Sequence, residues 1–217
     1  VQDLAVVAHL SALESSVPFL HFFDGFRTSH EIQKIELIDD DTLKSMVDMQ
    51  HVERFRSGAL SPDKPFAKVG AENPDVYFQG REAVNRFYNA IPDIVKRHMQ
   101  TVHKKTGRKY ELFQYVGAPD AQQLVISMGS STETIDETIN YLTGKGEKVG
   151  AIKVRLFRPF SVEDFIHAIP STVKQIAVLD RTKEPGSVGE PLYLDVVSAL
   201  KQKRSEEHTS ELQSLLI

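Results

Sequence analysis

The sequence contains no cysteine among its 217 residues. This absence excludes disulfide bonds, zinc sites with thiolate ligands, a cysteine nucleophile and iron–sulfur clusters that the chain itself would ligate in the usual way. Long apolar runs are also missing. The longest ones, such as Val17–Phe23, are far shorter than the roughly 20 residues that a membrane-spanning helix needs. The sequence therefore predicts no membrane span and no metal cluster of its own.

A basic run is absent too, and the net charge is -4. Nucleic-acid-binding surfaces are strongly basic, so we expect no nucleic-acid partner. The histidines show no metal-ligand spacing, since His98 and His103 do not share a helix face as an i, i+4 pair would. We therefore expect no metal site. No positively charged start followed by an apolar stretch marks a secretory leader, so a cytoplasmic location is expected.

The tail of the chain has an unusual sequence. Residues Arg204–Ser214 read RSEEHTSELQS, which is the in-frame translation of a widely used sequencing adapter. A natural polar tail is the alternative, but a match of this length is hard to reach by chance. We interpret 204–217 as an artefact of sequence assembly and leave it out of the reasoning on fold.

Strands and helices alternate in the second half of the chain. The apolar segment Gln123–Met128 leads through Gly129-Ser130-Ser131 into a helical pattern at Thr132–Leu142. Two more apolar runs follow, and each is separated from its neighbours by another helical pattern. Strands joined by helices of this length form parallel βαβ units. The predicted fold class is therefore α/β, with Leu124–Met128, Val149–Leu156 and Gln175–Asp180 as adjacent parallel strands.

The first half is less regular. The continuous apolar run VPFLHFF, Val17–Phe23, is typical of a strand buried on both faces. Breakers at Gly58–Gln79 predict an irregular connection. The strongest helical periodicity covers Arg81–Lys105, where Pro92 predicts a kink or a break and Gly107 predicts the end.

Three loops carry polar residues at the ends of expected strands, where α/β sheets place ligands. Gly129–Glu133 joins a strand to a helix start, whose N–H groups can hold an anion. The spacing of Ser130 and Glu133 also fits a capping box, which we favour.

The other two loops are Asp24–Glu31 and Asp180–Gly186. In the first, the candidate cofactor-binding residues are Asp24, Arg27, Ser29 and His30. Of these, Arg27, Ser29 and His30 could bind a carboxylate or diphosphate, although a turn at Asp24-Gly25 and a helix cap by Ser29 explain the loop equally well. In the second, the candidates are Arg181, Lys183 and Glu184, and we favour a domain interface over a ligand site.

Four segments resemble pyruvate:ferredoxin (flavodoxin) oxidoreductases: Ser15–Glu36, Gly129–Ile139, Val149–Ser161 and Leu179–Val196, which reads LDRTKEPGSVGEPLYLDV. The resemblance covers nearly all of Val1–Lys203, in order. It implies that 1–40 is the end of a first domain that holds the thiamine pyrimidine, 41–114 a connecting region, and 115–203 a second domain similar to the C-terminal domain of transketolases.

The resemblance also implies a long parent enzyme. Such enzymes use thiamine diphosphate, magnesium, coenzyme A and iron–sulfur clusters, and they pass electrons to ferredoxin or flavodoxin. None of these cofactor sites is complete here, and no catalytic residue of the family maps onto this chain. The expected partners are the remaining domains of the parent and a second parent chain in a homodimer. The alternatives are a segment of an oxidoreductase for another 2-oxoacid and a non-catalytic docking or scaffold domain.

Overall fold

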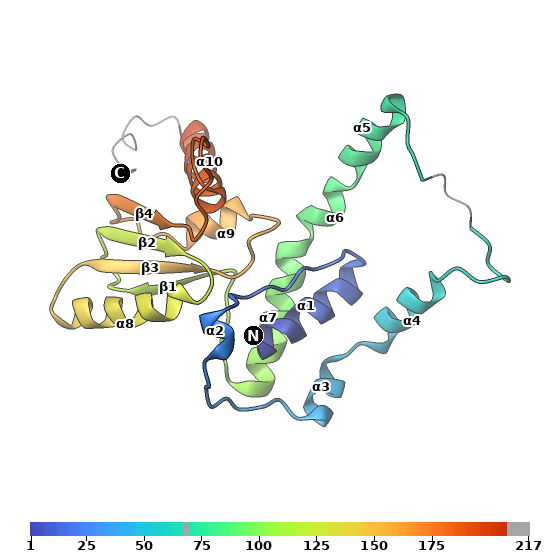
Figure 1. Cartoon of the computed structure of the whole chain (residues 1–217), viewed down its shortest axis with the longest axis horizontal. Helices are drawn as coiled ribbons and strands as arrows, with labels where there is room; N and C mark the ends of the chain where they lie inside the picture. The colour runs from blue at the N-terminus through green and yellow to red at the C-terminus, as the bar shows by residue number, and fades with distance from the viewer. Residues whose placement is uncertain (67–69, 208–217) are drawn as a thin grey trace. The chain divides into compact units, whose positions relative to one another are not determined.

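The computed structural model describes residues 1–66 and 70–207, with side chains described up to Lys203. The chain divides into two compact units (Figure 1). Unit 1 comprises Val1–Phe22 and Gln33–Tyr110, and unit 2 comprises Phe23–Ile32 and the chain from Glu111 on. We call Phe23–Ile32 the strap, because both of its ends continue into unit 1. The predicted domain boundaries refer to the domains of a longer enzyme and stay a prediction.

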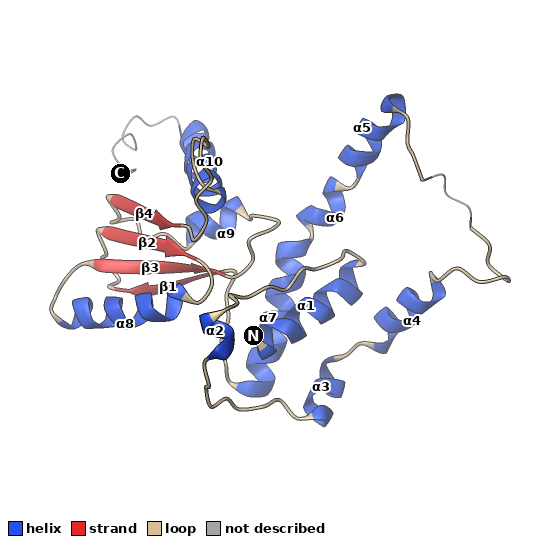
Figure 2. Ribbon diagram, in the orientation of Figure 1, coloured by secondary structure: helices blue, strands red, loops and turns tan. Residues whose placement is uncertain are grey.

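Unit 2 is built on a four-stranded sheet with the order β1-β3-β2-β4 (Figure 2). The central strand β2 pairs in parallel with β3 and with β4, whereas β1 pairs antiparallel with β3. The prediction of three adjacent parallel strands is therefore confirmed, and the antiparallel edge strand was not predicted. The bounds are β1 Phe113–Gly117, β2 Gln123–Ser127, β3 Val149–Val154 and β4 Gln175–Leu179.

Three helices cover this sheet. They are α8 (Ser131–Gly144), α9 (Val162–His167) and α10 (Pro191–Glu207). Helix α8 packs against β1 and β3, and α10 packs against β4 and α9. The apolar runs of the strands place Leu124, Ile126 and Ile152 in the core, each at most 1% exposed. The Phe165 ring, also fully buried, contacts Phe113 and Phe160 at centroid distances of 5.4 and 5.3 Å. Unit 2 therefore has a closed apolar core.

Unit 1 consists of six helices in its described residues. They are α1 (Gln2–Ser15), α3 (Asp40–Met46), α4 (Met49–Ser57), α5 (Pro74–Ala83), α6 (Asn85–Asn89) and α7 (Ile91–Thr106). Its core lies between α1 and α7, where Val7 and Leu10 face a stripe of buried residues that includes Val95, Met99 and Val102. In contrast, α4, α5 and α6 have no buried residue.

An ion-pair cluster fastens the beginning of α1 to the end of unit 1. The Asp3 carboxylate is 7% exposed and accepts hydrogen bonds from Arg108 Nε at 2.6 Å and from the Tyr110 hydroxyl at 2.8 Å. Burial raises the pKa of this carboxyl, but the hydrogen bonds from Arg108 and Tyr110 outweigh that effect and hold the pKa below its ordinary value.

The predicted helix Arg81–Lys105 is in fact parts of three helices. The chain breaks at Val84 and again at Ala90, where α7 begins. Pro92 lies in the first turn of α7, where its missing N–H would have had no partner in any case. Gly107 ends α7 as predicted, with a φ of +76°. The irregular connection is shorter than predicted, because α5 already starts at Pro74.

The segment Val17–Phe23 is not a strand, contrary to its sequence pattern. It is extended but pairs with no strand of the described residues. Leu20, Phe22 and Phe23 are 86, 62 and 58% exposed. A strand forms only where a neighbouring strand pairs with its backbone, and no described strand pairs with this run.

No helix in the described part of the chain is long and apolar enough to cross a membrane. The tail interpreted as an artefact lies largely outside the described residues, apart from the last turn of α10.

Candidate functional site

The three polar loops expected from the sequence meet at one edge of unit 2. Strands β2 and β4 run parallel and end beside each other, so Ser130 and Arg181 follow two neighbouring strand ends. The strap brings Asp24 to the same place. We call the four residues Asp24, Gly129, Ser130 and Arg181 the clamp.

The Asp24 carboxylate is the centre of the clamp. Its Oδ2 accepts a hydrogen bond from the Ser130 backbone N–H at 2.5 Å, and its Oδ1 forms an ion pair with Arg181 NH1 at 2.5 Å. The Asp24 side chain is only 16% exposed, whereas that of Arg181 is 61% exposed. Hydrogen bonds from the Ser130 hydroxyl and backbone, assisted by the Arg181 charge, hold the pKa of Asp24 below its ordinary value. Asp24 is therefore a bound, ionised carboxylate.

Gly129 makes room for that carboxylate. Its φ is +84°, a conformation that residues with a Cβ rarely adopt. A Cβ at this position would also lie 2.8 Å from Asp24 Oδ2. The glycine is thus needed both for the turn into α8 and for the close approach of the strap.

The favoured capping box of Ser130 and Glu133 does not form. Ser130 is the N-cap of α8, but its side chain accepts no capping hydrogen bond. Its hydroxyl lies 3.4 Å from Thr28 Oγ1 and from Arg181 NH1. The anion at the helix start is supplied by Asp24 instead. Local spacing predicts only caps from nearby residues, so this distant partner was not predicted.

The remaining strap candidates serve local structure or face solvent. The Ser29 hydroxyl donates to the Phe26 carbonyl at 2.8 Å, and His30 Nδ1 lies 2.5 Å from the same oxygen. Both contacts shape the short helix α2 (Arg27–His30). Arg27 is exposed.

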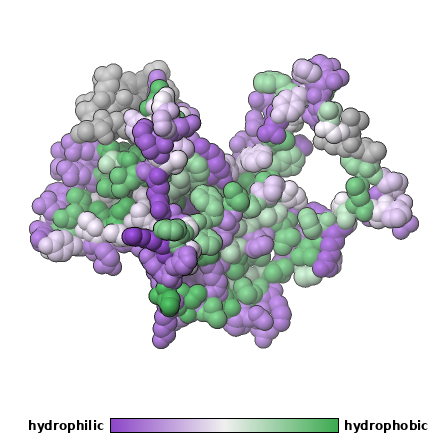
Figure 3. All heavy atoms as spheres, viewed as in Figure 1, coloured by the Kyte–Doolittle hydropathy of each residue, from purple (hydrophilic) through white to green (hydrophobic). Residues whose placement is uncertain are grey.

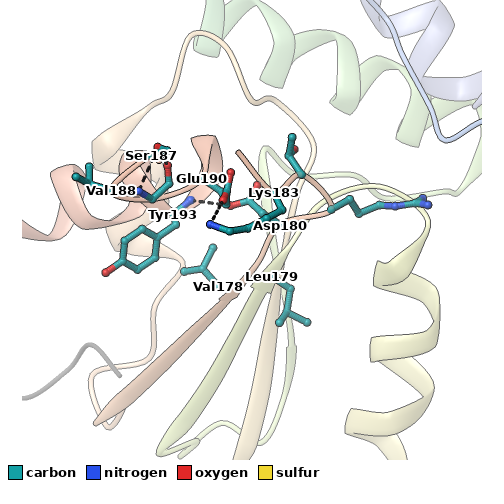
Figure 4. Close-up of a pocket in the computed structure, with 11 residues that line it drawn as sticks. Val178, Leu179, Asp180, Lys183, Ser187, Val188, Glu190 and Tyr193 are labelled. Atoms are coloured by element: carbon teal, nitrogen blue, oxygen red, sulfur yellow. Dashed lines mark hydrogen bonds and ion pairs between the residues drawn. The ribbon is translucent and has the colours of Figure 1, made fainter. Parts of the chain in front are cut away.

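The loop after β4 is tied to the beginning of α10. The Asp180 carboxylate accepts from the backbone N–H of Tyr193 at 3.0 Å, and Glu190 accepts from Lys183 Nζ and from the backbone N–H of Glu184, both at 3.0 Å. These groups surround a hollow of about 500 Å³ (Figure 4). Lys183 points toward Glu190 across this hollow. Since its charged groups are already paired, the hollow offers no unused recognition group from Asp180, Lys183 or Glu190.

No cluster of three or more His, Asp or Glu residues that suits a metal ion occurs among the described residues. Of the candidate residues, Asp24, Arg181 and Lys183 form ion pairs within unit 2, and the roles expected for the candidates stay predictions. Arg181 binds Asp24, and Lys183 binds Glu190.

Two family models match the chain. The model for pyruvate flavodoxin/ferredoxin oxidoreductase, thiamine-diphosphate-binding, matches residues 1–100, and that for pyruvate:ferredoxin oxidoreductase core domain II matches residues 121–213. The second match includes part of the tail, whose interpretation as an artefact stays a prediction.

Curated relatives match the same stretch. The chain is 58% identical to a pyruvate:ferredoxin oxidoreductase of Moorella thermoacetica over 93% of its length, and 57% identical to a pyruvate-flavodoxin oxidoreductase of Enterobacter agglomerans over 92%. In both comparisons it spans only 17% of the relative's length. A solved 2-oxoglutarate:ferredoxin oxidoreductase of Magnetococcus marinus covers 59% of the chain with 19% identity and a TM-score of 0.33, too low to carry an argument. With two family models that together match most of its length, the chain belongs to the pyruvate:ferredoxin (flavodoxin) oxidoreductase family.

Proposed function

We propose that this chain is a segment of an enzyme that oxidatively decarboxylates pyruvate to acetyl-coenzyme A and passes the electrons to ferredoxin or flavodoxin. The observation that carries the proposal is the identity of 56 to 58% between this chain and relatives that are named for this activity. The chain spans 17% of the length of each of these relatives. The clamp and the Asp180 loop both lie in stretches that the two family models match.

The exposed apolar side chains support the proposal that other parts of a larger protein cover this segment. Large apolar side chains stand exposed along the strap and the residues that flank it, among them Leu20 at 86%, Phe26 at 83% and Ile32 at 100%. Apolar residues also reach the surface in Figure 3. Proteins that work alone seldom expose apolar side chains in this number over one short stretch, because such patches mark contact with other chains or domains.

The described residues do not fit the parent's cofactors. A thiamine diphosphate needs a metal-anchored diphosphate site, yet the described chain has no acidic cluster for the metal. The beginning of α8, where a phosphate would find backbone N–H groups, is filled by the Asp24 carboxylate. Iron–sulfur clusters need thiolates, and the sequence has no cysteine. We therefore propose that the cofactor chemistry belongs to other parts of the parent and that this segment is a scaffold.

The test compares two proteins. The purified 217-residue chain is assayed with pyruvate, coenzyme A, thiamine diphosphate, magnesium and a viologen dye. A full-length enzyme that contains this segment is assayed in parallel with pyruvate and with 2-oxoglutarate. We expect dye reduction by the full-length enzyme with pyruvate and none by the chain alone above a heat-killed control.

Each outcome has a definite meaning. Turnover by the isolated chain would show that this segment contains an active site and would overturn the scaffolding role. A full-length enzyme that prefers another 2-oxoacid would replace the pyruvate assignment and leave the family intact. Sedimentation of the full-length enzyme tests the proposed homodimer. The cytoplasmic location and the electron carriers remain proposals for the parent, to be tested by fractionation and by reduction of purified ferredoxin and flavodoxin.

A further inference from the structure

We propose that the clamp is an internal lock: Asp24 takes the anion position at the beginning of α8 and so fastens the strap to the strand-end edge of unit 2. The edge is then a structural joint and not a ligand site. This inference concerns contacts within the chain and does not depend on the proposed activity.

The first support is the chemistry of the position. The beginning of a helix presents free N–H groups and a partial positive charge, and the side chain of Arg181 adds a full charge beside it. An anion is therefore favoured there, and the Asp24 carboxylate meets both groups at 2.5 Å. A phosphate or carboxylate ligand would have to displace a group that is already held at high effective concentration by the same chain.

The second support is the fit of the surrounding backbone. Gly129 leaves no side chain in the path of the strap, and a Cβ there would collide with the carboxylate. Thr28, one turn further along the strap, places its hydroxyl 3.4 Å from that of Ser130. Gly129 in unit 2 and Thr28 in the strap thus both fit the contact between Asp24 and Ser130, as expected of a structural joint.

The third support is where the partners lie in the sequence. Asp24 falls in the stretch matched by the thiamine-diphosphate-binding model, whereas Ser130 and Arg181 fall in the stretch matched by the core domain II model. The structure nevertheless groups the strap with unit 2. The lock therefore joins segments that sequence comparison assigns to two separate models.

The test uses hydrogen exchange of the 217-residue chain, read at the Ser130 amide and at the strap. Asp24→Ala removes the acceptor, so we expect these amides to exchange about tenfold faster or more, since a hydrogen bond to a charged group contributes roughly 1.5–3 kcal/mol. Arg181→Gln removes an exposed partner, so its effect should stay below about fivefold. The double variant should match Asp24→Ala alone, because both changes break the same pair.

The matched control is Asp120→Ala. Asp120 also belongs to unit 2 and also forms an ion pair, with Lys148 Nζ at 2.6 Å, but it lies away from the clamp in the loop between β1 and β2. It should leave exchange at Ser130 and the strap unchanged. If Asp24→Ala fails to fold, Asp24→Asn keeps the shape and removes the charge, and the same comparison applies.

Rescue by a small anion separates a lock from a ligand site. Formate added to Asp24→Ala should slow the exchange of Ser130 in a saturable manner, while chloride at matched ionic strength should not. Formate and inorganic phosphate should have no such effect on the wild-type chain. The proposal is overturned if Asp24→Ala exchanges at the wild-type rate, or if either anion protects the wild type as strongly as formate protects the variant.

Discussion

Unit 1 and unit 2 bury their apolar side chains to different degrees. In unit 2 the strands, α9 and α10 enclose a core that contains Leu124, Ile126 and Phe165, each at most 1% exposed. In unit 1 the core is confined largely to the contact between α1 and α7, and α4, α5 and α6 bury nothing. Phe55 on α4 and Phe78 on α5 are both 69% exposed.

This difference shows which unit is stabilised by packing among its own residues. Isolated helices shorter than about 12 residues are marginal in water, so α4, α5 and α6 gain little from their backbone alone. Packing must supply the rest, and within the described chain it is sparse: Arg54 of α4 donates hydrogen bonds to the carbonyls of Leu13 and Glu14 in α1, but no residue of the three helices is buried. Under the proposed function, other parts of the parent cover them. Unit 2 needs no such help, because its sheet is closed by its own helices.

The largest expected effect removes a ring from the closed core. Phe165→Ala should lower the free energy of unfolding by about 3–5 kcal/mol, since the ring is fully buried and packs on Phe113 and Phe160. Phe78→Ala, the same change on an exposed ring of α5, should cost less than about 0.5 kcal/mol. Urea denaturation followed by circular dichroism measures both. Equal losses would mean that α5 packs against something in this chain after all.

The next prediction concerns the ion-pair cluster of Asp3, Arg108 and Tyr110 in unit 1. Asp3→Asn should destabilise unit 1 by about 1–3 kcal/mol, because the amide leaves Arg108 without its buried charged partner. Asp120→Asn, at an exposed pair, should cost at most about 1 kcal/mol. Hydrogen exchange resolved by segment should place the Asp3 loss in α1 and α7. A loss spread evenly over β2 and β3 would show that the two units unfold as one.

A smaller effect depends on pH and concerns the clamp. The pKa of Asp24 is lowered in the folded chain, chiefly by the hydrogen bonds of Ser130, so the clamp contributes stability above the unfolded pKa of about 3.9. That contribution is lost as the pH falls through the lower, folded pKa. The strap should therefore stay protected from pH 7 to about 5 and open below about pH 4. Asp24→Asn should remove this dependence at the strap while leaving any acid sensitivity of Asp3 in place.

The smallest effect concerns the extended run before the strap. Phe22→Ser should change the stability of this chain by less than about 0.5 kcal/mol, because the ring is 62% exposed. In a full-length enzyme the same change should be strongly destabilising if Val17–Phe23 is there a buried strand, as its composition predicts. Thermal denaturation of both proteins compares the two cases, with Arg27→Ser as the control on an exposed strap residue. A similarly small loss of stability in both proteins would show that Val17–Phe23 is exposed in the full-length enzyme as well.

The sequence predicts the parts of this fold whose determinants are local. The parallel strands β2, β3 and β4 stand out because each is a nearly unbroken apolar run, and Gly107 ends α7 by its own backbone freedom. Strand β1 was missed because Gln114 interrupts its apolar pattern. In the structure Gln114 Oε1 accepts a hydrogen bond at 2.9 Å from the guanidinium of Arg155, which directly follows β3.

The missed features all depend on partners that are distant in the sequence. The run Val17–Phe23 has the composition of a buried strand, but no described strand pairs with it. The candidate site was half predicted: the loops containing Asp24, Ser130 and Arg181 were each singled out, yet nothing in their spacing shows that they meet. A carboxylate from a distant part of the chain can accept a hydrogen bond from a helix start without any local sequence signal. The sequence around Ser130 therefore predicts a capping box and not the contact with Asp24.

The separation of the clamp's partners also has a consequence for synthesis. Ser130 follows Asp24 by 106 residues. At a ribosomal rate of about 5–20 residues per second, the strap emerges roughly 5–20 s before the helix start that receives it. During that interval Phe22, Phe23 and Phe26 have no clamp to hold them, and the nascent chain exposes an apolar stretch to whatever binds such segments. Because of this order of synthesis the clamp closes late: Ser130 becomes available only after β2 has been made, and Arg181 only after β4.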